Sequence, residues 1–371
     1  MGQTLVIAEK PSVAGDIARA LGGFKKDGDF WVSDAMIVGS AVGHLLEIKA
    51  PEEYDVKRGR WSFANLPVLP PHFDLQPIKK SIKKFEGLEK KIRSRSVTDI
   101  INACDAGREG ELIFRYIIQA TGTKKPIRRL WLQSMTKASI QKAFTALRSD
   151  AEMKPLEAAA RSRSEADWLV GINGTRALTA FNSKDGGFFL TTVGRVQTPT
   201  LAIVVAREEE ITHFKPQNYW EVHTTFGAQA GDYDSVWVDA DFKKTKGQSA
   251  ELKPERLWTA AEAQAIVAKC QGKLGIVTDH KRRATSAPPA LFDLTSLQRE
   301  ANGRFGFPAK MTLAILQRLY ERHKVLTYPR TDSRALPEDY PETMKETLSH
   351  LQKLEAYNAF AGQILMSGWV K

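Results

Sequence analysis

Tyr328, in the segment Leu326-Thr327-Tyr328-Pro329-Arg330-Thr331-Asp332-Ser333, has the neighbours that a tyrosine nucleophile needs. A residue before proline is disfavoured in the helical region, so Tyr328 is expected in an extended segment. Side chains two positions apart lie on the same side of an extended chain, so Arg330 can project beside Tyr328. A phenol with an ordinary pKa of about 10 attacks well only where a cation or a base stabilises the phenolate. The Arg330 guanidinium could also hold a phosphate group. The local alternative is a loop tyrosine that packs its ring while Arg330 stays solvated.

Carboxylates follow two predicted strands and form a candidate metal site. Glu9, beside Lys10, comes at the end of the first strand, and Asp105, Glu109 and Glu111 come after the second. Carboxylate oxygens are hard ligands suited to Mg²⁺, which bridges to phosphate without a full protein cage. The alternative is that Glu109 and Glu111 are ordinary acidic residues in a first helical turn, where the helix dipole favours them.

These groups can meet only if the segments that carry them share one edge of a sheet. Residues 3–8 and 97–103 have the apolar, partly β-branched composition of buried strands, and residues 129–132 are the third predicted strand. Helices are predicted over residues 11–21 and 111–120. Strands that alternate with helices predict a parallel α/β sheet, whose ligands gather beyond the carboxyl ends of its strands.

The rest of the chain has a different pattern. Residues 153–207 are mainly helical in pattern, with a break at Gly186-Gly187. β-Branched and aromatic residues between 219 and 242 predict strands. Two helices are predicted further on, one that starts after an N-cap at Asp293 and one that carries residues 311–320 on an apolar face.

The charge of the chain points to an anionic partner. The 371 residues include 54 basic and 43 acidic side chains, which give a formal net charge of +11. Lysine and arginine cluster between residues 79 and 95 and again at 281–283, a pattern typical of proteins that bind nucleic acid with salt-dependent affinity. Tryptophans spread along the chain could stack on bases, although most tryptophans pack in cores or at their rims. The alternative is a charged surface that only keeps the protein in solution.

Several classes of protein are excluded. Two cysteines do not make a disulfide scaffold, and no CxxC or HExxH pair provides a zinc site. No apolar run approaches the roughly 20 residues that cross a membrane, and the N-terminus has no basic leader before its apolar stretch. We therefore expect a soluble multidomain protein of a reducing compartment, cytoplasmic and without a membrane partner.

Four motifs, in order along the chain, resemble the signature motifs of type IA DNA topoisomerases, and the topoisomerase III branch fits best. They are Glu9-Lys10-Pro11-Ser12, Asp105-Ala106-Gly107-Arg108-Glu109-Gly110, Gly194-Arg195-Val196-Gln197-Thr198-Pro199-Thr200-Leu201 and Thr327-Tyr328-Pro329-Arg330-Thr331-Asp332-Ser333. Gly43-His44-Leu45, residues 165–171 and residues 293–302 fit the same order. One such motif is weak, but several in order over nearly the whole chain are highly specific.

The resemblance implies an α/β Toprim domain with a parallel sheet, followed by helical and β-rich domains: the multidomain core of a type IA topoisomerase. It implies that Tyr328 attacks a phosphodiester of single-stranded DNA, which leaves a 5′-phosphotyrosyl link and a free 3′-hydroxyl. Another strand passes through the gap, and the hydroxyl reseals it without ATP. The sequence has no GxxxxGK[ST] loop, which agrees with this.

The resemblance also implies a role for individual residues. The implied site is Tyr328, Glu9, Lys10 and Arg330 for catalysis, Glu9, Asp105 and Glu109 for Mg²⁺, and Arg195 and Gln197 for the DNA backbone. Glu9 is the implied general acid or base at the leaving 3′-oxygen, and Lys10 and Arg330 would stabilise the phosphate.

The acidic turn departs from the family pattern at one position. Many members have Asp-x-Asp-x-Glu, whereas Gly107 stands here at the middle acidic position. Glu111 is a candidate substitute for the missing ligand. With few carboxylates to hold the ion, we predict a weak Mg²⁺ site that fills only at high metal concentration.

The resemblance implies four domains and an incomplete C-terminal part. The expected domains are a Toprim domain over residues 1–150 with about 31–75 inserted toward the helical domain, the first part of a helical DNA-binding domain over 151–215, the first part of a β-rich hinge domain over 216–284, and a truncated catalytic tyrosine domain over 285–371. Complete relatives continue beyond the tyrosine motif, so a second chain is a candidate source of the missing domains.

Two other functions stay open on the sequence. A Toprim nuclease or primase-like protein would use the acidic turns without needing Tyr328 and Arg330. A fragment that binds single-stranded DNA but cannot complete the reaction would use only the basic groups.

Overall fold

The computed structural model describes residues 2–53, 61–132, 134–243, 251–323, 325–336, 338 and 340–370. The chain divides into two compact units. One unit contains residues 1–198 together with 288–371, and the other contains residues 199–287. This division is coarser than the expected four domains, whose boundaries stay a prediction.

A seven-stranded sheet forms the centre of the first unit, with the strand order β2-β3-β4-β1-β7-β8-β9. Its strands are β1 (Gln3–Ala8), β2 (Lys25–Asp27), β3 (Phe30–Val32), β4 (Met36–Ser40), β7 (Val97–Ala103), β8 (Ile127–Arg129) and β9 (Arg148–Ser149). The inner strands β4, β1, β7 and β8 are parallel, and the outer pairs are antiparallel. The predicted parallel α/β sheet is confirmed.

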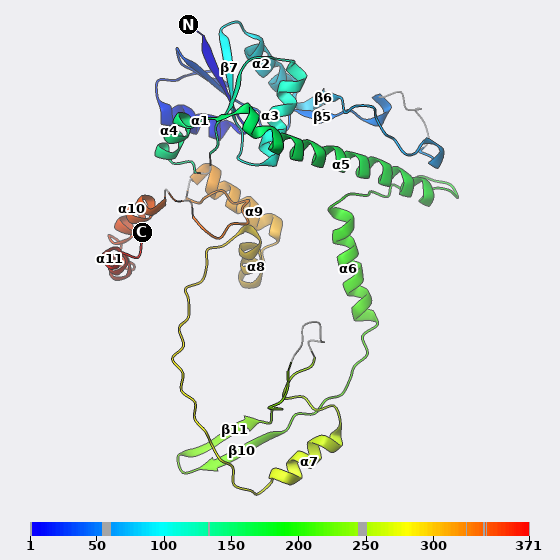
Figure 1. Cartoon of the computed structure of the whole chain (residues 1–371), viewed down its shortest axis with the longest axis vertical. Helices are drawn as coiled ribbons and strands as arrows, with labels where there is room; N and C mark the ends of the chain where they lie inside the picture. The colour runs from blue at the N-terminus through cyan, green and yellow to red at the C-terminus, as the bar shows by residue number, and fades with distance from the viewer. Residues whose placement is uncertain are drawn as a thin grey trace. The chain divides into compact units, whose positions relative to one another are not determined.

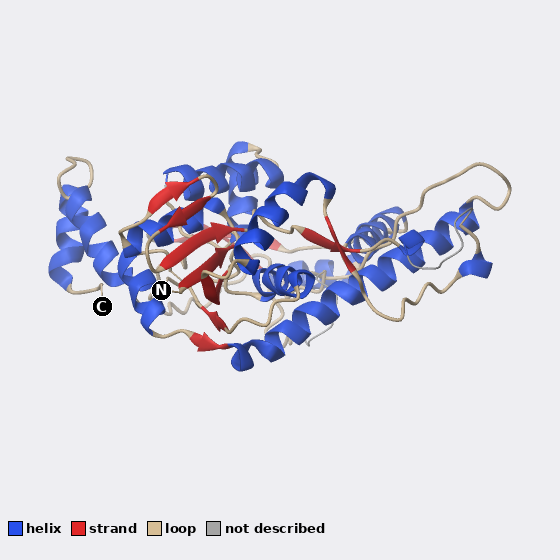
Figure 2. Ribbon diagram, turned by 90° about the horizontal axis from the view of Figure 1, so that it is seen from above, coloured by secondary structure: helices blue, strands red, loops and turns tan. Residues whose placement is uncertain are grey.

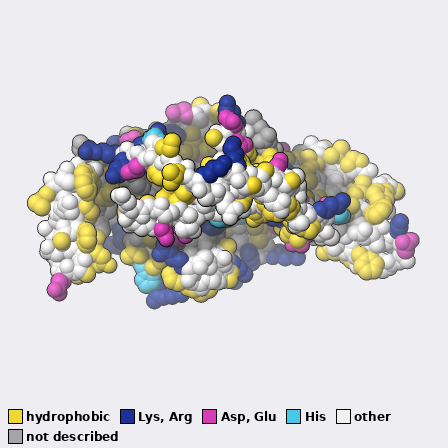
Figure 3. Space-filling view, turned by 90° about the horizontal axis from the view of Figure 1, so that it is seen from below, with side chains coloured by type: hydrophobic (Ala, Val, Ile, Leu, Met, Phe, Trp, Pro, Cys, Tyr) yellow, Lys and Arg dark blue, Asp and Glu magenta, His cyan; other side chains and the backbone are white. Residues whose placement is uncertain are grey.

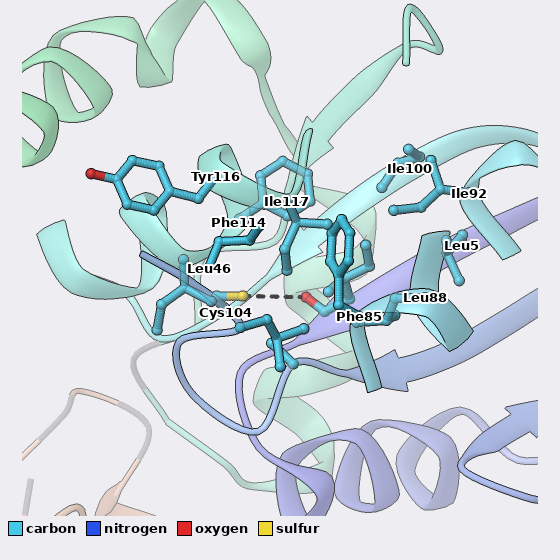
Figure 4. Packing of buried hydrophobic residues seen from close by; sticks show 14 of the residues in the cluster. Leu5, Leu46, Phe85, Leu88, Ile92, Ile100, Cys104, Phe114, Tyr116 and Ile117 are labelled. Atoms are coloured by element: carbon cyan, nitrogen blue, oxygen red, sulfur yellow. Dashed lines mark hydrogen bonds between the residues drawn. The ribbon is translucent and has the colours of Figure 1, made fainter. Parts of the chain in front are cut away.

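Side chains of β1 alternate between two apolar layers, as the pleat of a strand requires. The covering helices are α1 (Pro11–Leu21), α2 (Ile82–Arg93), α3 (Arg108–Thr121) and α4 (Lys137–Thr145). Leu5 and Ile7 pack in a cluster with residues of α2 and α3, whereas Val6 and Ala8 pack in a cluster with residues of α1 and α4. Figure 2 shows helices on both sides of the strands. Figure 4 shows the first cluster, in which the Cys104 Sγ lies 3.7 Å from the carbonyl oxygen of Ile7.

The strands predicted at residues 3–8 and 97–103 are observed with these bounds. The third predicted strand was misplaced: β8 pairs with β7 over residues 127–129 and not 129–132. Leu130 and Leu132 pack in the cluster beneath α1 and α4. Their apolar pattern therefore reflects burial outside the ladder.

One long helix, α5 (Asp150–Asn182), carries the chain away from the sheet. Ser149 starts it with a capping box, in which its hydroxyl accepts from the N–H of Glu152 and the Glu152 carboxylate accepts from the N–H of Ser149. The short antiparallel pair β5 (Leu46–Ile48) and β6 (Leu75–Pro77) lies alongside α5 (Figure 1). Trp168 of α5 donates to the carbonyl of Lys49 at 3.2 Å, and Asn173 exchanges two hydrogen bonds with the backbone of Val68.

Other elements complete the first unit. They are the single 3₁₀ turns η1 (Pro51–Glu53), η2 (Phe63–Asn65) and η3 (Lys79–Ser81), helices α8 (Leu294–Phe305), α9 (Ala309–Arg318), α10 (Tyr340–Leu351) and α11 (Asn358–Ser367), and the π-helical turn η4 (Leu319–His323). Asp293 caps α8, as predicted, by accepting a hydrogen bond of 2.7 Å from the N–H of Ser296. The predicted break near Gly186-Gly187 is also observed, because α5 ends at Asn182 and the next helix begins at Gln197.

The second unit is smaller. Helix α6 (Gln197–Thr212) leads into it, and it contains the hairpin β10 (His223–Ala228) and β11 (Gly231–Val236) and helix α7 (Ala260–Cys270). The predicted strands between 219 and 242 are therefore a single hairpin in the described residues, and the rings of Phe226 and Tyr233 stack across it.

Large apolar side chains remain exposed outside the sheet. They include Ile203 in α6, Leu274 and Ile276 after α7, and Phe360 in α11. Figure 3 shows hydrophobic side chains exposed on one face of the molecule, among scattered basic side chains. Such exposed apolar surface often marks contact regions. No helix in the described ranges is both long enough and apolar enough to cross a membrane.

Candidate active site

The ends of β1 and β7 bring the predicted acidic residues together. The two strands are parallel neighbours with Ala8 opposite Ala103, so the turns that follow them meet at one edge of the sheet. Lys10 Nζ donates a hydrogen bond of 3.0 Å to Asp105 Oδ2 and lies 3.8 Å from Glu9 Oε1. The structure thus places Glu9, Lys10 and Asp105 in one cluster, as the sequence predicted.

Tyr328 reaches this cluster from a distant part of the chain. Lys10 Nζ lies 4.9 Å from the centre of the Tyr328 ring, a cation–π geometry. The Tyr320 ring of η4 packs edge-on against the same ring, with a centroid distance of 5.6 Å. Tyr328 keeps 38% of its surface exposed, so a ligand can still approach it.

Burial and the acidic neighbours shift the pKa of Tyr328 in one direction, and the basic neighbours shift it in the other. Burial raises the pKa of Tyr328, and the charges of Asp105 and Glu9 raise it further, whereas Lys10 and Arg330 lower it. Burial likewise raises the pKa of Tyr320, to about 12. Both phenols are therefore neutral near pH 7 in the free chain, and a phenolate at Tyr328 depends on its cationic neighbours.

Glu9 has the environment of a proton donor. Burial raises the pKa of this carboxyl group, and the charges of Asp105 and Glu109 add to the rise, while Lys10 opposes it. Burial lowers the pKa of Lys10, but Asp105, Tyr328 and Glu9 outweigh that effect and raise it above its ordinary value. The pair therefore consists of a carboxyl group that favours its proton and an ammonium group that keeps its charge.

His44 is a neighbour of this cluster to which the sequence assigned no role. Its Nε2 lies 3.8 Å from Glu109 Oε1, and burial lowers the pKa of its imidazole although Glu109 opposes the effect. The N–H groups of Val42 and Gly43 both donate to the carbonyl of Glu9. His44 was found in one of the matched motifs, but only the structure shows which residue it faces.

Glu111 is not at the acidic site, which corrects its proposed role as a substitute ligand. Its side chain is fully buried, accepting hydrogen bonds from Asn102 Nδ2 at 3.0 Å and Arg115 Nε at 2.7 Å. Arg129 Nε lies 3.5 Å from the other side of this carboxylate. Glu111 therefore neutralises the buried Arg115 and Arg129 in the interior. Glu109, two residues earlier in the same helix, faces solvent.

Arg129 holds the turn that carries Asp105. Its guanidinium, 1% exposed, donates to the backbone carbonyls of Cys104 at 2.7 Å and Asp105 at 2.8 Å and to Asn102 Oδ1 at 2.8 Å. Sequence reasoning missed this clamp. The available indication was polar Asn102 within an otherwise apolar strand, since a buried polar group needs a partner.

The carboxylates suit a weakly held divalent cation. No three His, Cys, Asp or Glu side chains form a metal-binding group within the described ranges. Glu9 Oε1 lies 3.8 Å and Asp105 Oδ2 lies 3.0 Å from the same Lys10 Nζ, so two hard oxygen donors lie close together. Mg²⁺ commonly takes one or two carboxylates and completes its shell with water and phosphate, and this donor set fits that habit.

The remaining predicted site residues lie further out. Arg330 is exposed, and its charge acts on Tyr328 as described above. Arg195 donates to Asp167 Oδ1 of α5 at 2.9 Å, and Gln197 is the first residue of α6. The structure does not test the DNA contacts expected of Arg195 and Gln197.

Two family models match this chain. Residues 151–370 match the model described as DNA topoisomerase, and residues 4–135 match the model described as Toprim domain.

Similar curated proteins include DNA topoisomerase 3 of Bacillus licheniformis, 41% identical over 370 residues, and DNA topoisomerase 3 of Bacillus subtilis, 40% identical over 370 residues. Each comparison covers 99% of this chain and 48% of the relative, so the chain spans about half the length of the curated relatives it matches.

A solved structure of full-length topoisomerase I from Thermotoga maritima is similar in fold. It aligns with 93% of this chain and 52% of its own, with a TM-score of 0.57 and 23% sequence identity.

Proposed function

This chain belongs to the type IA DNA topoisomerase family, and on that premise we propose that it cuts one DNA strand through a covalent link to Tyr328 and reseals it without ATP. Between the two steps another strand passes through the gap. The observation that carries the proposal is the contact of Tyr328 with Lys10, which is itself hydrogen-bonded to Asp105 and next to Glu9.

In the proposed cleavage step, the Tyr328 oxygen attacks the phosphorus of single-stranded DNA. The phenol proton leaves to solvent, the bond from phosphorus to the 3′-oxygen breaks, and a 5′-phosphotyrosyl bond forms. Glu9 donates its proton to the leaving 3′-oxygen, a role that suits its raised pKa. Resealing runs in reverse, with Glu9 taking the proton back from the attacking 3′-hydroxyl.

Lys10 and Arg330 stabilise charge in this scheme. Lys10 keeps its proton and lies against the attacking ring, so it can favour the phenolate and then the phosphate oxygens. Arg330 is free to swing toward the phosphate because its side chain is exposed.

The proposed cofactor is Mg²⁺, held by Asp105 and Glu109 with Glu9 nearby. When bound, the ion would neutralise these carboxylates and polarise the phosphate. Arg195 and Gln197 are proposed to bind the DNA backbone. The similar proteins are bacterial, so we expect the chain to act on DNA in the cytoplasm.

The decisive experiment is a search for the covalent adduct. The chain is incubated with single-stranded oligonucleotide labelled at its 3′ end and Mg²⁺, quenched with denaturant and resolved on a denaturing gel; the 3′ label stays on the fragment that a 5′-phosphotyrosyl link would hold. The expected result is labelled protein that is lost in Tyr328→Phe and kept in the control Tyr357→Phe, whose ring lies 53% exposed at the start of α11.

Other outcomes distinguish other functions. Free cleavage that survives Tyr328→Phe would identify a metal-dependent nuclease. Retarded DNA with neither product would identify a binding fragment. Arg330→Ala should lower the rate of adduct formation more than DNA affinity, because its proposed role is in the transition state.

A further inference from the structure

A cavity of about 550 Å³ lies beside the acidic cluster and is not used by the proposed reaction. Its walls come from one side of α1, the β2–β3 hairpin, the end of β4 with the loop after it, and η3 with the first turn of α2. Ser12 of its lining is two residues from Lys10, and Val42 donates a backbone hydrogen bond to Glu9. The cavity therefore shares two backbone segments with the active site but has its own side chains.

The lining of this cavity is positively charged. Four cations, Arg19, Lys26, Lys80 and Lys84, face it together with a single acid, Asp29. Lys84 pairs with Asp29 at 3.1 Å, and Arg19 pairs with Asp16 outside the lining. Within the part of the chain that the structure describes, Lys26 and Lys80 form no ion pair, so two positive charges remain to attract an anion.

An aromatic wall accompanies these charges. Trp31 packs partly against the cluster beneath α1 and also lines the cavity, with Lys26 Nζ 5.8 Å from its ring centre. An indole beside cations provides a stacking surface for a base next to a charged phosphate.

Hydroxyl and amide donors complete the wall. Ser12 lies in the first turn of α1 and Ser81 directly precedes α2. No side chain caps the start of α1 or of α2, so no capping oxygen accepts a hydrogen bond from the N–H groups of their first turns. Hydroxyl groups and helix starts of this kind commonly bind phosphate oxygens.

We propose that this cavity binds a phosphate and its adjoining base in a single-stranded nucleic acid, as an anchor separate from the cleavage site. The inference rests on the proposed function only in that DNA is the ligand. It gives a function to the lysine cluster between residues 79 and 95, whose first part enters the cavity at Lys80 and Lys84. The anchor would hold the strand near Glu9 while Tyr328 is covalently occupied.

The test measures binding in the Tyr328→Phe background, so it does not depend on cleavage. Affinity for a fluorescent single-stranded oligonucleotide is measured at several salt concentrations for two double variants. The cavity pair is Lys26→Gln/Lys80→Gln, and the control pair, outside the cavity, is Lys90→Gln/Lys142→Gln. Each phosphate contact contributes about 0.7 to the salt slope. The cavity pair should therefore lower the slope by about 0.7–1.4 and weaken binding several-fold at low salt, well beyond the control pair.

Trp31 provides a second, independent readout. Trp31→Ala should weaken binding by about tenfold, the usual scale for loss of one base stack, whereas Trp31→Phe should keep most of the affinity. Because Trp31 also packs on the core, circular dichroism must first show that Trp31→Ala is folded. If it is not, the surface lysine pair and Trp31→Phe decide the question.

Two outcomes would overturn the inference. Equal losses in the cavity pair and the control pair would show a diffuse charge effect and no site. The cavity substitutions could instead abolish binding of a free mononucleotide and leave the salt dependence of oligonucleotide affinity unchanged. That result would assign the cavity to free nucleotides. Failure of the adduct assay would leave both outcomes measurable, since neither uses the Tyr328 hydroxyl.

Discussion

At the scale of single residues, the role proposed for Glu9 comes at a cost in stability. The environment that suits Glu9 to donate a proton to the leaving 3′-oxygen in the proposed reaction also penalises its carboxylate form. The folded chain holds this proton more tightly than the unfolded chain does, so ionisation of Glu9 disfavours folding. That cost is absent below the ordinary pKa of 4.5, grows as pH rises from 4.5 to the raised pKa, and stays constant above it.

Replacement of Glu9 by Gln should therefore stabilise the fold at neutral pH while it removes the proton donor. We expect a higher melting temperature for Glu9→Gln than for the native chain at pH 7.5, with the difference fading as pH falls from the raised pKa of Glu9 to 4.5. Thermal unfolding followed by circular dichroism across this pH range measures it. The exposed Glu86→Gln is the control, and a lower melting temperature for Glu9→Gln at pH 7.5 would contradict the prediction.

Gly107 offers a direct test of the metal site. Its φ of −178° is extended backbone that any residue adopts, and no heavy atom lies within 4 Å of a Cβ added there. Gly107→Asp should restore an acidic ligand without strain and lower the Mg²⁺ concentration for half-maximal adduct formation by about tenfold, the scale on which partners of metal ligands act. Gly107→Asn is the matched uncharged control. An equal Mg²⁺ requirement in both variants would show that this position does not face the ion.

At the scale of elements, the packing of α3 against the strand end positions the acidic turn. A Cβ added at Gly110 would lie 2.3 Å from the carbonyl oxygen and 2.8 Å from the nitrogen of Asp105. Only glycine allows the first turn of α3 to lie so close to this backbone. On the other side, Arg129 clamps the same turn through its hydrogen bonds to Cys104 and Asp105.

Gly110→Ala should push the turn and α3 apart. We expect a loss of stability of about 1–3 kcal/mol, the usual cost of overpacking, and a fall of at least tenfold in adduct formation. Gly107→Ala, three residues earlier in open space, is the control and should keep both. Denaturant unfolding and the adduct assay measure the two effects, and native rates in a folded Gly110→Ala would disprove the positioning role.

At the scale of the whole molecule, a long connection without regular structure ends the second unit. Residues 273–293 contain no helix or strand, and Leu274 and Ile276 are almost fully exposed. Lys281, Arg282 and Arg283 lie within this stretch. A protease can bind such a segment without first unfolding a packed element.

Limited digestion with trypsin should therefore cut first at residues 281–283. Mass spectrometry of the earliest products should show a fragment that ends there and a complementary fragment that contains Tyr328. Replacement of all three basic residues by Gln should delay this cut and leave the melting temperature unchanged. First cuts within α1 to α3 would contradict the division into two units.

Much of the central sheet could be predicted from the sequence. The apolar, partly β-branched runs at residues 3–8 and 97–103 favoured buried strands, and the predicted helices that follow them favoured a parallel arrangement. Parallel neighbours place their carboxyl ends together, so the meeting of Glu9, Lys10 and Asp105 followed from chain order. The third strand was misplaced because an apolar run also fits a buried segment outside the ladder.

Residue type alone could not show that Glu111 is a buried structural residue and not part of the acidic site. Glu109 and Glu111 stand in the same helical turn and have the same chemistry, but their directions around the helix differ by about 200°. One faces solvent beside His44, and the other neutralises Arg115 and Arg129 in the interior. Arg115, one turn further along α3, and Arg129, from β8, determine which glutamate is structural.

By itself, the sequence determined the parallel sheet, the family and the residue types of the chemistry, because periodicity and ordered motifs are local properties of the chain. Tertiary structure alone decided that Tyr328 lies against Lys10, that Arg129 clamps the acidic turn, and that Lys26, Lys80 and Trp31 line one cavity. These groups come from segments far apart along the chain. Their contacts depend on how the helices pack on the two faces of the sheet. They also depend on which side chains are buried and which charges lie near them, and a local sequence pattern does not determine either.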